Sequence, residues 1–297
     1  MLREGRFIPI PGGPANRFDH GAYDAARGRV FVAHTSADAL VVIDHVAGTC
    51  EQTLRGFPEA AGVVVSAGTV LVSNRAAASV TTIDASTLAG TRTYATAARP
   101  NGVALAPGRR LALVACLGDE TQEPVLHAID LGSGAGKTLA LPGSPRWCVV
   151  DQAEERVFCA IQAPSLVVSV RLAGFVEQGC WELPAAGAHG LDLDEEGGRL
   201  FVACDAGELV ALDSTTGAVR GRWLLSGAPD ATFYNPDSGL VHVAVKSPGL
   251  VATVDPASGE QWIAVTEAGA GTTALVRPDR LYVFLPERGG ALELIEE

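Results

Sequence analysis

Lysine is almost absent from this sequence, which has only Lys137 and Lys246 among its 297 residues. The 22 Lys and Arg residues stand against 34 Asp and Glu residues, so the formal net charge is −12. Duplex nucleic acids require a basic footprint, and anionic membrane surfaces attract polybasic patches. We therefore expect neither a nucleic acid nor a membrane as partner.

Long apolar segments are also missing. No run approaches the ~18 residues of a membrane-spanning helix. The N-terminus, MLREGRFIPIPGG, lacks the apolar stretch of roughly 7–15 residues that marks a secretory signal. We expect a cytoplasmic protein, and in that compartment reduced thiols at the six cysteines. No CxxC pair, HExxH, GxSxG or glycosylation sequon occurs. No window shows a helical period, so little helix is expected.

What the sequence has is a repeat. Short apolar segments that end in an acid recur as VVID, TTID, HAID, VALD, ATVD and ELIE, with the acids at Asp44, Asp84, Asp130, Asp213, Asp255 and Glu296. The steps between these acids are 40, 46, 83, 42 and 41 residues, and the long step contains one more copy, in which Arg171 takes the acid position. Seven copies at ~40–46 residues match the period of a four-stranded propeller blade.

The repeat resembles a known family. Segments 31–49, FVAHTSADALVVIDHVAGT, and 99–116, RPNGVALAPGRRLALVAC, are similar to the YVTN repeat of bacterial seven-bladed β-propellers. The resemblance implies an all-β fold with four antiparallel strands per blade, in one domain over residues 1–297. Only Glu297 follows the last acid, whereas segment 4–10, EGRFIPI, reads as a fourth strand without the first three. We therefore expect blade 7 to combine residues 4–10 with about 269–297, which closes the ring.

Three features invite a chemical interpretation that we set aside. GSGAGKT (132–138) has one residue too few between its glycines for a phosphate-binding loop and lies in a hairpin turn. The strand-end aspartates are expected to cap turns by accepting backbone N–H groups. The acid cluster at 192–196 is expected to form a solvated rim.

The mouth of the central channel is the candidate site. In each blade the start of the first strand and the end of the second meet on one face. Counting along the repeats places at this face the first-strand residues His20, Glu59, Asn101, Arg146, His189, Asp230 and Thr272, and the second-strand residues His34, Asn74, Cys116, Ile161, Cys204, Val245 and Leu285. Convergent His, carboxylate and Arg groups predict a ligand site formed by His20, Glu59, Asn101, Arg146, His189 and Asp230. Imidazole and carboxylate also suit a divalent metal, with His20, His34, His189 and Asp230 as ligands. The alternative is that these groups only face water.

Three classes of function remain open. The first is a propeller that binds a small molecule or divalent metal and acts as a lactone or ester hydrolase. Glu59, Asn101 and Asp230 resemble the Glu/Asn/Asp metal site of gluconolactonase-like propellers, although those have six blades. The second is a non-catalytic scaffold for another protein. The third is an elimination enzyme similar to streptogramin lyase, whose repeated Trp-containing motif is missing here. We expect a monomer in each case.

Overall fold

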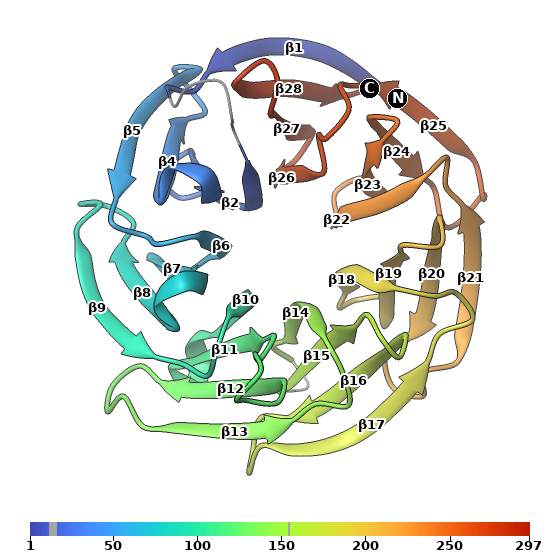
Figure 1. Ribbon diagram of the computed structural model, residues 1–297. Helices are drawn as coiled ribbons and strands as arrows, with labels where there is room; N and C mark the ends of the chain where they lie inside the picture. Colours follow the sequence, from blue (N-terminus) through green and yellow to red (C-terminus); the bar gives the residue numbers. More distant parts are fainter. Residues whose placement is uncertain (12–16, 154) are drawn as a thin grey trace.

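The computed structural model describes residues 1–11, 17–153 and 155–297, which form seven four-stranded antiparallel sheets arranged around one axis (Figure 1). The chain folds as a seven-bladed β-propeller. Helix is limited, in the described residues, to the single turns Thr35–Ala37, Arg75–Ala77 and Pro107–Arg109. None of these turns is long or apolar enough to cross a membrane.

Each blade runs from an inner strand at the axis to an outer strand at the rim. Blades 1 to 3 are β2 (Phe18–Asp24), β3 (Arg29–His34), β4 (Ala39–Asp44) and β5 (Thr49–Arg55); β6 (Ala60–Ser66), β7 (Thr69–Asn74), β8 (Ser79–Asp84) and β9 (Gly90–Ala95); β10 (Pro100–Ala106), β11 (Leu111–Cys116), β12 (Val125–Asp130) and β13 (Gly136–Ala140). Blades 4 to 6 are β14 (Pro145–Asp151), β15 (Arg156–Ile161), β16 (Leu166–Arg171) and β17 (Val176–Glu182); β18 (Ala188–Asp194), β19 (Arg199–Cys204), β20 (Glu208–Asp213) and β21 (Val219–Leu224); β22 (Ala228–Asn235), β23 (Leu240–Ser247), β24 (Leu250–Val254) and β25 (Gln261–Val265). Blade 7 is β26 (Thr272–Val276), β27 (Arg280–Leu285), β28 (Gly290–Glu296) and β1 (Leu2–Pro9).

The core lies between adjacent blades. The second and third strands are sandwiched by neighbouring sheets on both faces, so they read as continuous apolar runs. The third residue of the second strand fills the largest core position in several blades, as Phe31, Phe158, Phe201 and Tyr282. His242 occupies the same position in blade 6, where Thr253 and Glu296 satisfy its ring nitrogens.

The N-terminal strand completes blade 7, as the sequence predicts. β1 pairs antiparallel with β28, and the two chain ends lie side by side (Figure 1). Ile8 is fully buried in this seam, and the Ile10 N–H donates to the Gly289 carbonyl at 2.9 Å. The seam covers two strand edges that would otherwise be free to pair with another chain.

The strand-end aspartates cap the turns between third and fourth strands, which confirms that interpretation. The Asp84 carboxylate accepts N–H groups of Ser86 and Thr87 at 2.9 and 2.8 Å, and Asp130 accepts those of Gly132 and Ser133. Equivalent bonds reach Asp44, Asp213 and Asp255. Hydrogen bonds from Ser86 and Thr87 lower the pKa of Asp84 to about 2, so the cap is charged at neutral pH.

The acid cluster differs from its expectation as a solvated rim. Asp194 is buried and forms an ion pair with Arg199 at 2.8 Å. Asp192 lines an internal cavity and accepts two backbone hydrogen bonds. The physical reason is strand alternation: β18 turns both residues inward, whereas Glu195 and Glu196 in the following turn are exposed.

Candidate functional site at the channel mouth

A repeated β-bulge shapes the inner strands where they reach the mouth. In blade 1 Phe18 pairs with His34 and Gly21 with Val32, so three steps on the inner strand match two on its partner. The same register shift occurs at the start of the inner strand in blades 2 to 6. A bulge re-aims side chains and often lies next to a site. The first bulge position holds Asp19, Ala61, Asn101, Arg146, His189 and Asp230.

The second bulge position is small in most blades because the next blade passes close to it. A Cβ added at Gly62 would lie 2.1 Å from the Asn101 carbonyl oxygen, and one at Gly190 would lie 2.2 Å from that of Asp230. Blades 1 and 4 differ, with His20 and Trp147 at this position. Their rings stack with centroids 3.8 Å apart, from inner strands on opposite sides of the axis (Figure 1). This pair therefore spans the channel.

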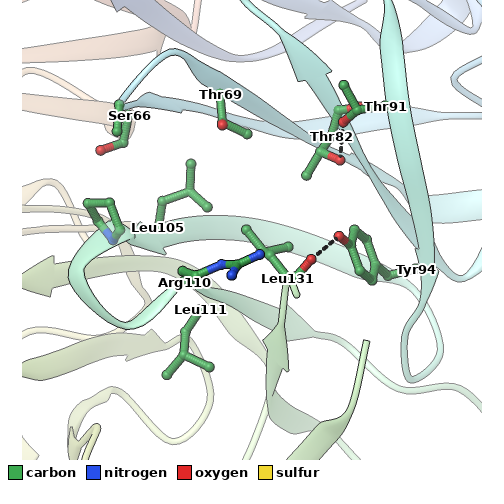
Figure 2. A pocket seen from close by; sticks show the side chains of 11 residues that line it. Ser66, Thr69, Thr82, Thr91, Tyr94, Leu105, Arg110, Leu111 and Leu131 are labelled. Carbon is green, nitrogen blue, oxygen red and sulfur yellow. Dashed lines mark hydrogen bonds between the residues drawn. The ribbon is translucent and has the colours of Figure 1, made fainter. Parts of the chain in front are cut away.

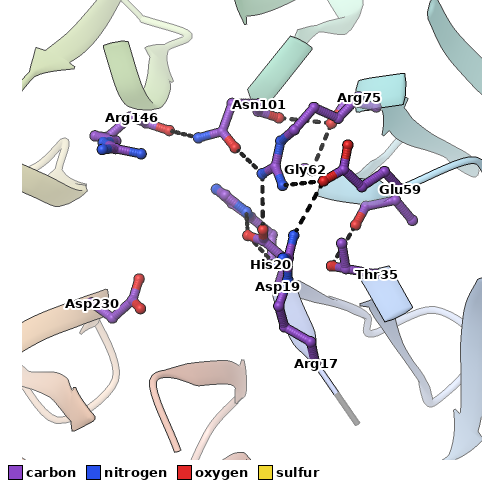
Figure 3. A network of polar contacts seen from close by, with 12 residues as sticks. Arg17, Asp19, His20, Thr35, Glu59, Gly62, Arg75, Asn101, Arg146 and Asp230 are labelled. Atoms are coloured by element: carbon purple, nitrogen blue, oxygen red, sulfur yellow. Dashed lines mark hydrogen bonds and ion pairs between the residues drawn. The ribbon is translucent and has the colours of Figure 1, made fainter. Parts of the chain in front are cut away.

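On one side of the mouth, charged groups converge on Arg75. Its guanidinium forms an ion pair with Asp19 at 3.0 Å, donates to the Asn101 side chain, and lies 3.9 Å from Glu59 (Figure 3). Asp19 also accepts from His20 Nδ1 at 2.6 Å. Burial opposes ionisation of Asp19, but the hydrogen bonds and charges of His20 and Arg75 outweigh it and hold the pKa of this carboxyl below its usual value.

On the other side, a second chain of contacts runs through blades 4 to 6. Arg146 Nε donates to Gln162 at 2.9 Å, and Gln162 donates to Asp205 at 2.5 Å. Asp205 contacts His189 Nδ1 at 3.0 Å. His189 Nε2 lies 3.4 Å from Asp230, which in turn lies 3.4 Å from the Lys246 ammonium. The Asn101 amide donates to the Arg146 carbonyl at 2.9 Å and so joins the two chains.

Arg146 and His189 are the groups with unused chemical capacity. Gln162 is neutral, and no carboxylate among the described residues forms an ion pair with the Arg146 guanidinium. Burial lowers the pKa of Arg146, and the charges of Asp205 and Asp230 only partly oppose this. Burial also works against ionisation of Asp205, yet hydrogen bonds from His189 and Gln162 keep its pKa below the usual value. The ionised Asp205 fixes the orientation of the His189 ring.

The structure brings all six predicted ligand-binding residues into these two chains: His20, Glu59, Asn101, Arg146, His189 and Asp230. Their exact positions differ in blade 1: the count along the repeats made His20 equivalent to Asn101, whereas Asp19 has that position. Likewise Pro145, not Arg146, pairs with Ile161. Glu59 lies in the turn before β6, and its position is held by the Asp38 side chain.

His34 lies apart from the polar chains. It is buried, its ring packs on Phe18 at 4.7 Å, and burial lowers its pKa. Of the four predicted metal ligands, only His189 and Asp230 contact each other in the described structure. No group of three or more His, Cys, Asp or Glu side chains in residues 1–11, 17–153 and 155–297 has an arrangement that could hold a metal ion. The metal stays a prediction.

The residues that sequence reasoning missed lie one position beyond the predicted ones. Asp19 precedes His20, and four contributors directly follow the predicted second-strand ends: Arg75, Gln162, Asp205 and Lys246. Their shared place after each second strand is a sequence signal that could have found them. With them the mouth contains four carboxylates, from Asp19, Glu59, Asp205 and Asp230, and three Lys or Arg side chains, from Arg75, Arg146 and Lys246.

A separate hollow of about 280 Å³ lies between blades 2 and 3, away from these chains (Figure 2). Its polar groups partner one another: the Tyr94 hydroxyl donates to the Leu131 carbonyl at 2.6 Å, and the Thr82 and Thr91 hydroxyls lie 2.7 Å apart. We assign no function to it.

Comparisons with known proteins support the fold. No family model matches the chain, and no curated protein matches it. A solved structure described as Kuenenia stuttgartiensis hydrazine synthase superposes with a TM-score of 0.84 at 13% identity, over 97% of this chain and 99% of that one. A streptogramin B lyase structure superposes with a TM-score of 0.82 at 12% identity, over 99% and 97%. At such identities the likeness shows the fold alone.

Proposed function

We propose that the channel mouth binds a small organic acid, or the ester or lactone of one. The observation that carries this proposal is Arg146, a half-buried guanidinium whose hydrogen-bonded side-chain partner is neutral. A buried cation without a contacting anion is unfavourable, and a carboxylate would supply two charge-assisted hydrogen bonds. Asp205 and Asp230 disfavour a multiply charged anion such as a phosphate at the same place.

His189 supplies the chemistry in this proposal. Held by Asp205 on one nitrogen, its ring can move a proton at Nε2, which points toward Asp230. A positioned imidazole suits hydrolysis of a lactone or ester, with Arg146 stabilising the oxyanion. The same proton transfer suits an elimination, and one structural neighbour is by its title a lyase. We favour hydrolysis because Arg146 provides a cation where the carbonyl oxygen gains charge.

The proposal is tested by ligand-dependent melting. Gluconate, glutamate and glucono-δ-lactone are each added to the purified protein, with and without Mg²⁺, Ca²⁺ or Zn²⁺. A ligand at 100 times its Kd stabilises by about 2.7 kcal/mol, which raises the melting temperature of a chain this size by several degrees. We expect at least one acid or lactone to do so, and Arg146→Gln to abolish the shift.

Arg109→Gln is the matched control, because Arg109 lies on an exposed turn and pairs with Glu155. It should keep the full shift. His189→Gln should retain binding of an acid within about threefold and lose lactone hydrolysis measured by acid release. Absence of any shift, or a shift that survives Arg146→Gln, would refute the mouth as the binding site and favour the scaffold alternative.

A further inference from the structure

Beyond the His20–Trp147 pair, the inner strands line an open cavity of about 310 Å³. We call this cavity the channel chamber and define it by His20, Tyr23, Trp147, Asp192 and Phe233, with valines of the inner strands between them. Its size is at the lower end of small-molecule sites. Arg146, Asn101 and Glu59 do not line it, so it is distinct from the mouth.

Two polar groups lining the chamber have unused hydrogen-bonding capacity. Asp192 accepts the Leu193 and Tyr234 N–H groups at 2.9 and 2.7 Å, and no described Lys or Arg forms an ion pair with it. A carboxylate has about four acceptor positions, so about two remain. His20 is 6% exposed, and its Nε2 is buried without a partner. Asp19 takes up Nδ1 of the same ring, so Nε2 is the ring position open to a ligand.

The walls of the chamber are apolar and aromatic. The Trp147 ring packs edge-on against Phe233 with centroids 6.3 Å apart, and Tyr23 adds a third ring from blade 1. Aromatic faces attract cations, most strongly where water is excluded. The Asp192 carboxylate and three aromatic rings therefore favour a ligand that donates hydrogen bonds, carries positive charge and has an apolar body.

The approach from the far end of the channel has the same electrostatic character. Asp192 also lines a second hollow there, together with Asp194, Glu195, Glu196 and Arg277. Arg277 is already paired with Asp237 through two hydrogen bonds. Acidic walls raise the local concentration of cations.

We propose that the channel chamber binds a small organic ammonium ion with an aromatic or alkyl body. The ammonium group lies against Asp192, and the body packs on Trp147 and Phe233. This site goes beyond the proposed function at the mouth and does not depend on it.

Calorimetry with 2-phenylethylammonium and its neutral isostere 2-phenylethanol tests the proposal on the unmodified protein. At pH 8 the ammonium should bind at least tenfold more tightly than the alcohol. In NMR spectra of the complex, its ring protons should show NOEs to Trp147 and Phe233. Equal affinities, no binding, or NOEs only to exposed residues would overturn the proposal.

Asp192→Asn should weaken ammonium binding at least tenfold. Glu196→Gln is the matched control, since it removes one negative charge from the same end of the channel without touching the chamber, and it should change affinity less than twofold. Should Asp192→Asn not fold, the comparison of ammonium and alcohol on the unmodified protein still decides. Equal losses in the two variants would mean general electrostatic attraction and would overturn the specific site.

Discussion

Single residues at the inner-strand bulges set how closely the blades approach one another. Gly62 is the clearest case: its N–H donates to the Ser73 hydroxyl, which donates in turn to the Asn101 carbonyl. A methyl group at Gly62 would meet that carbonyl at 2.1 Å. The bulge position therefore demands glycine through packing between blades and not through an unusual backbone angle.

Gly62→Ala should destabilise the protein by about 1–3 kcal/mol or more, because backbone atoms of the next blade must move. Gly90→Ala is the control, since an added Cβ there meets nothing within 4 Å. Urea unfolding followed by circular dichroism measures both variants. Equal midpoints would show that the blades are not packed this closely.

Asp192 carries a pH dependence that the chamber should display. Burial raises the pKa of this carboxyl to about 7, partly opposed by the hydrogen bonds from the Tyr234 and Leu193 N–H groups. The titratable and charged groups that line the surrounding cavities are His20, Tyr23, Cys148, Asp194, Glu195, Glu196, Tyr234 and Arg277. Because the raised pKa belongs to an acid, ionised Asp192 costs folding free energy, and this cost is absent below about pH 4 and complete above pH 7.

Ammonium binding changes with pH in the opposite direction to folding stability. Affinity rises as the pH rises, because binding requires the ionised Asp192 carboxylate. Affinity for 2-phenylethylammonium should be constant above about pH 7.5 and fall about tenfold per pH unit well below 7, since an alkyl ammonium stays charged to about pH 10. Calorimetry between pH 5.5 and 8.5 measures this. An affinity independent of pH, or one that rises in acid, would contradict the assignment to Asp192.

Among the structural elements, β1 closes the ring, because it is the outer strand of blade 7 and pairs with β28. Deleting residues 1–11 removes the outer strand of blade 7, and with it Ile8 and Ile10, which are 0% and 4% exposed. At roughly 0.8 kcal/mol per buried CH₂, together with the lost ladder, the free energy of unfolding should drop by several kcal/mol.

Two point variants provide a comparison for the stability loss caused by this deletion. Ile8→Ala should cost about 2–5 kcal/mol, whereas Val265→Ala, on an outer strand at 73% exposure, should cost less than about 0.5. Thermal melting compares the three proteins. A deletion that melts within a degree or two of the full chain would contradict closure by β1.

Strand pairing shows which features of the secondary-structure elements could be predicted from the sequence. Blade period, strand order and closure follow from the repeat, because period-2 apolar segments between turns leave few alternatives. Cys148 and Cys159 are cross-strand neighbours, and all six cysteines are free thiols. The bulge between Pro145 and Cys148 was not foreseen, because one extra residue leaves no mark in apolar periodicity. Because of that residue, Pro145 and not Arg146 pairs with Ile161.

At the scale of the whole molecule, the near-symmetry of the ring determines where polar side chains from different blades come together. Equivalent positions converge on the axis, so counting repeats was enough to find the mouth and most of its polar groups. Their pairing could not be counted, because it joins different blades: Arg75 to Asn101, and Gln162 to Asp205. The chamber was missed for a related reason: its size depends on which blades place glycine beside the axis and which place His20 and Trp147 there.

The central claim is that Arg146 and His189 form a binding site for a small organic acid at the mouth. The most direct measurement is a crystal structure of the protein with gluconate or glutamate, whichever raises the melting temperature more. We predict carboxylate density within hydrogen-bonding distance of the Arg146 guanidinium, with the ligand extending toward His189. Density for the same ligand elsewhere on the protein, with the mouth holding only water, would contradict the account.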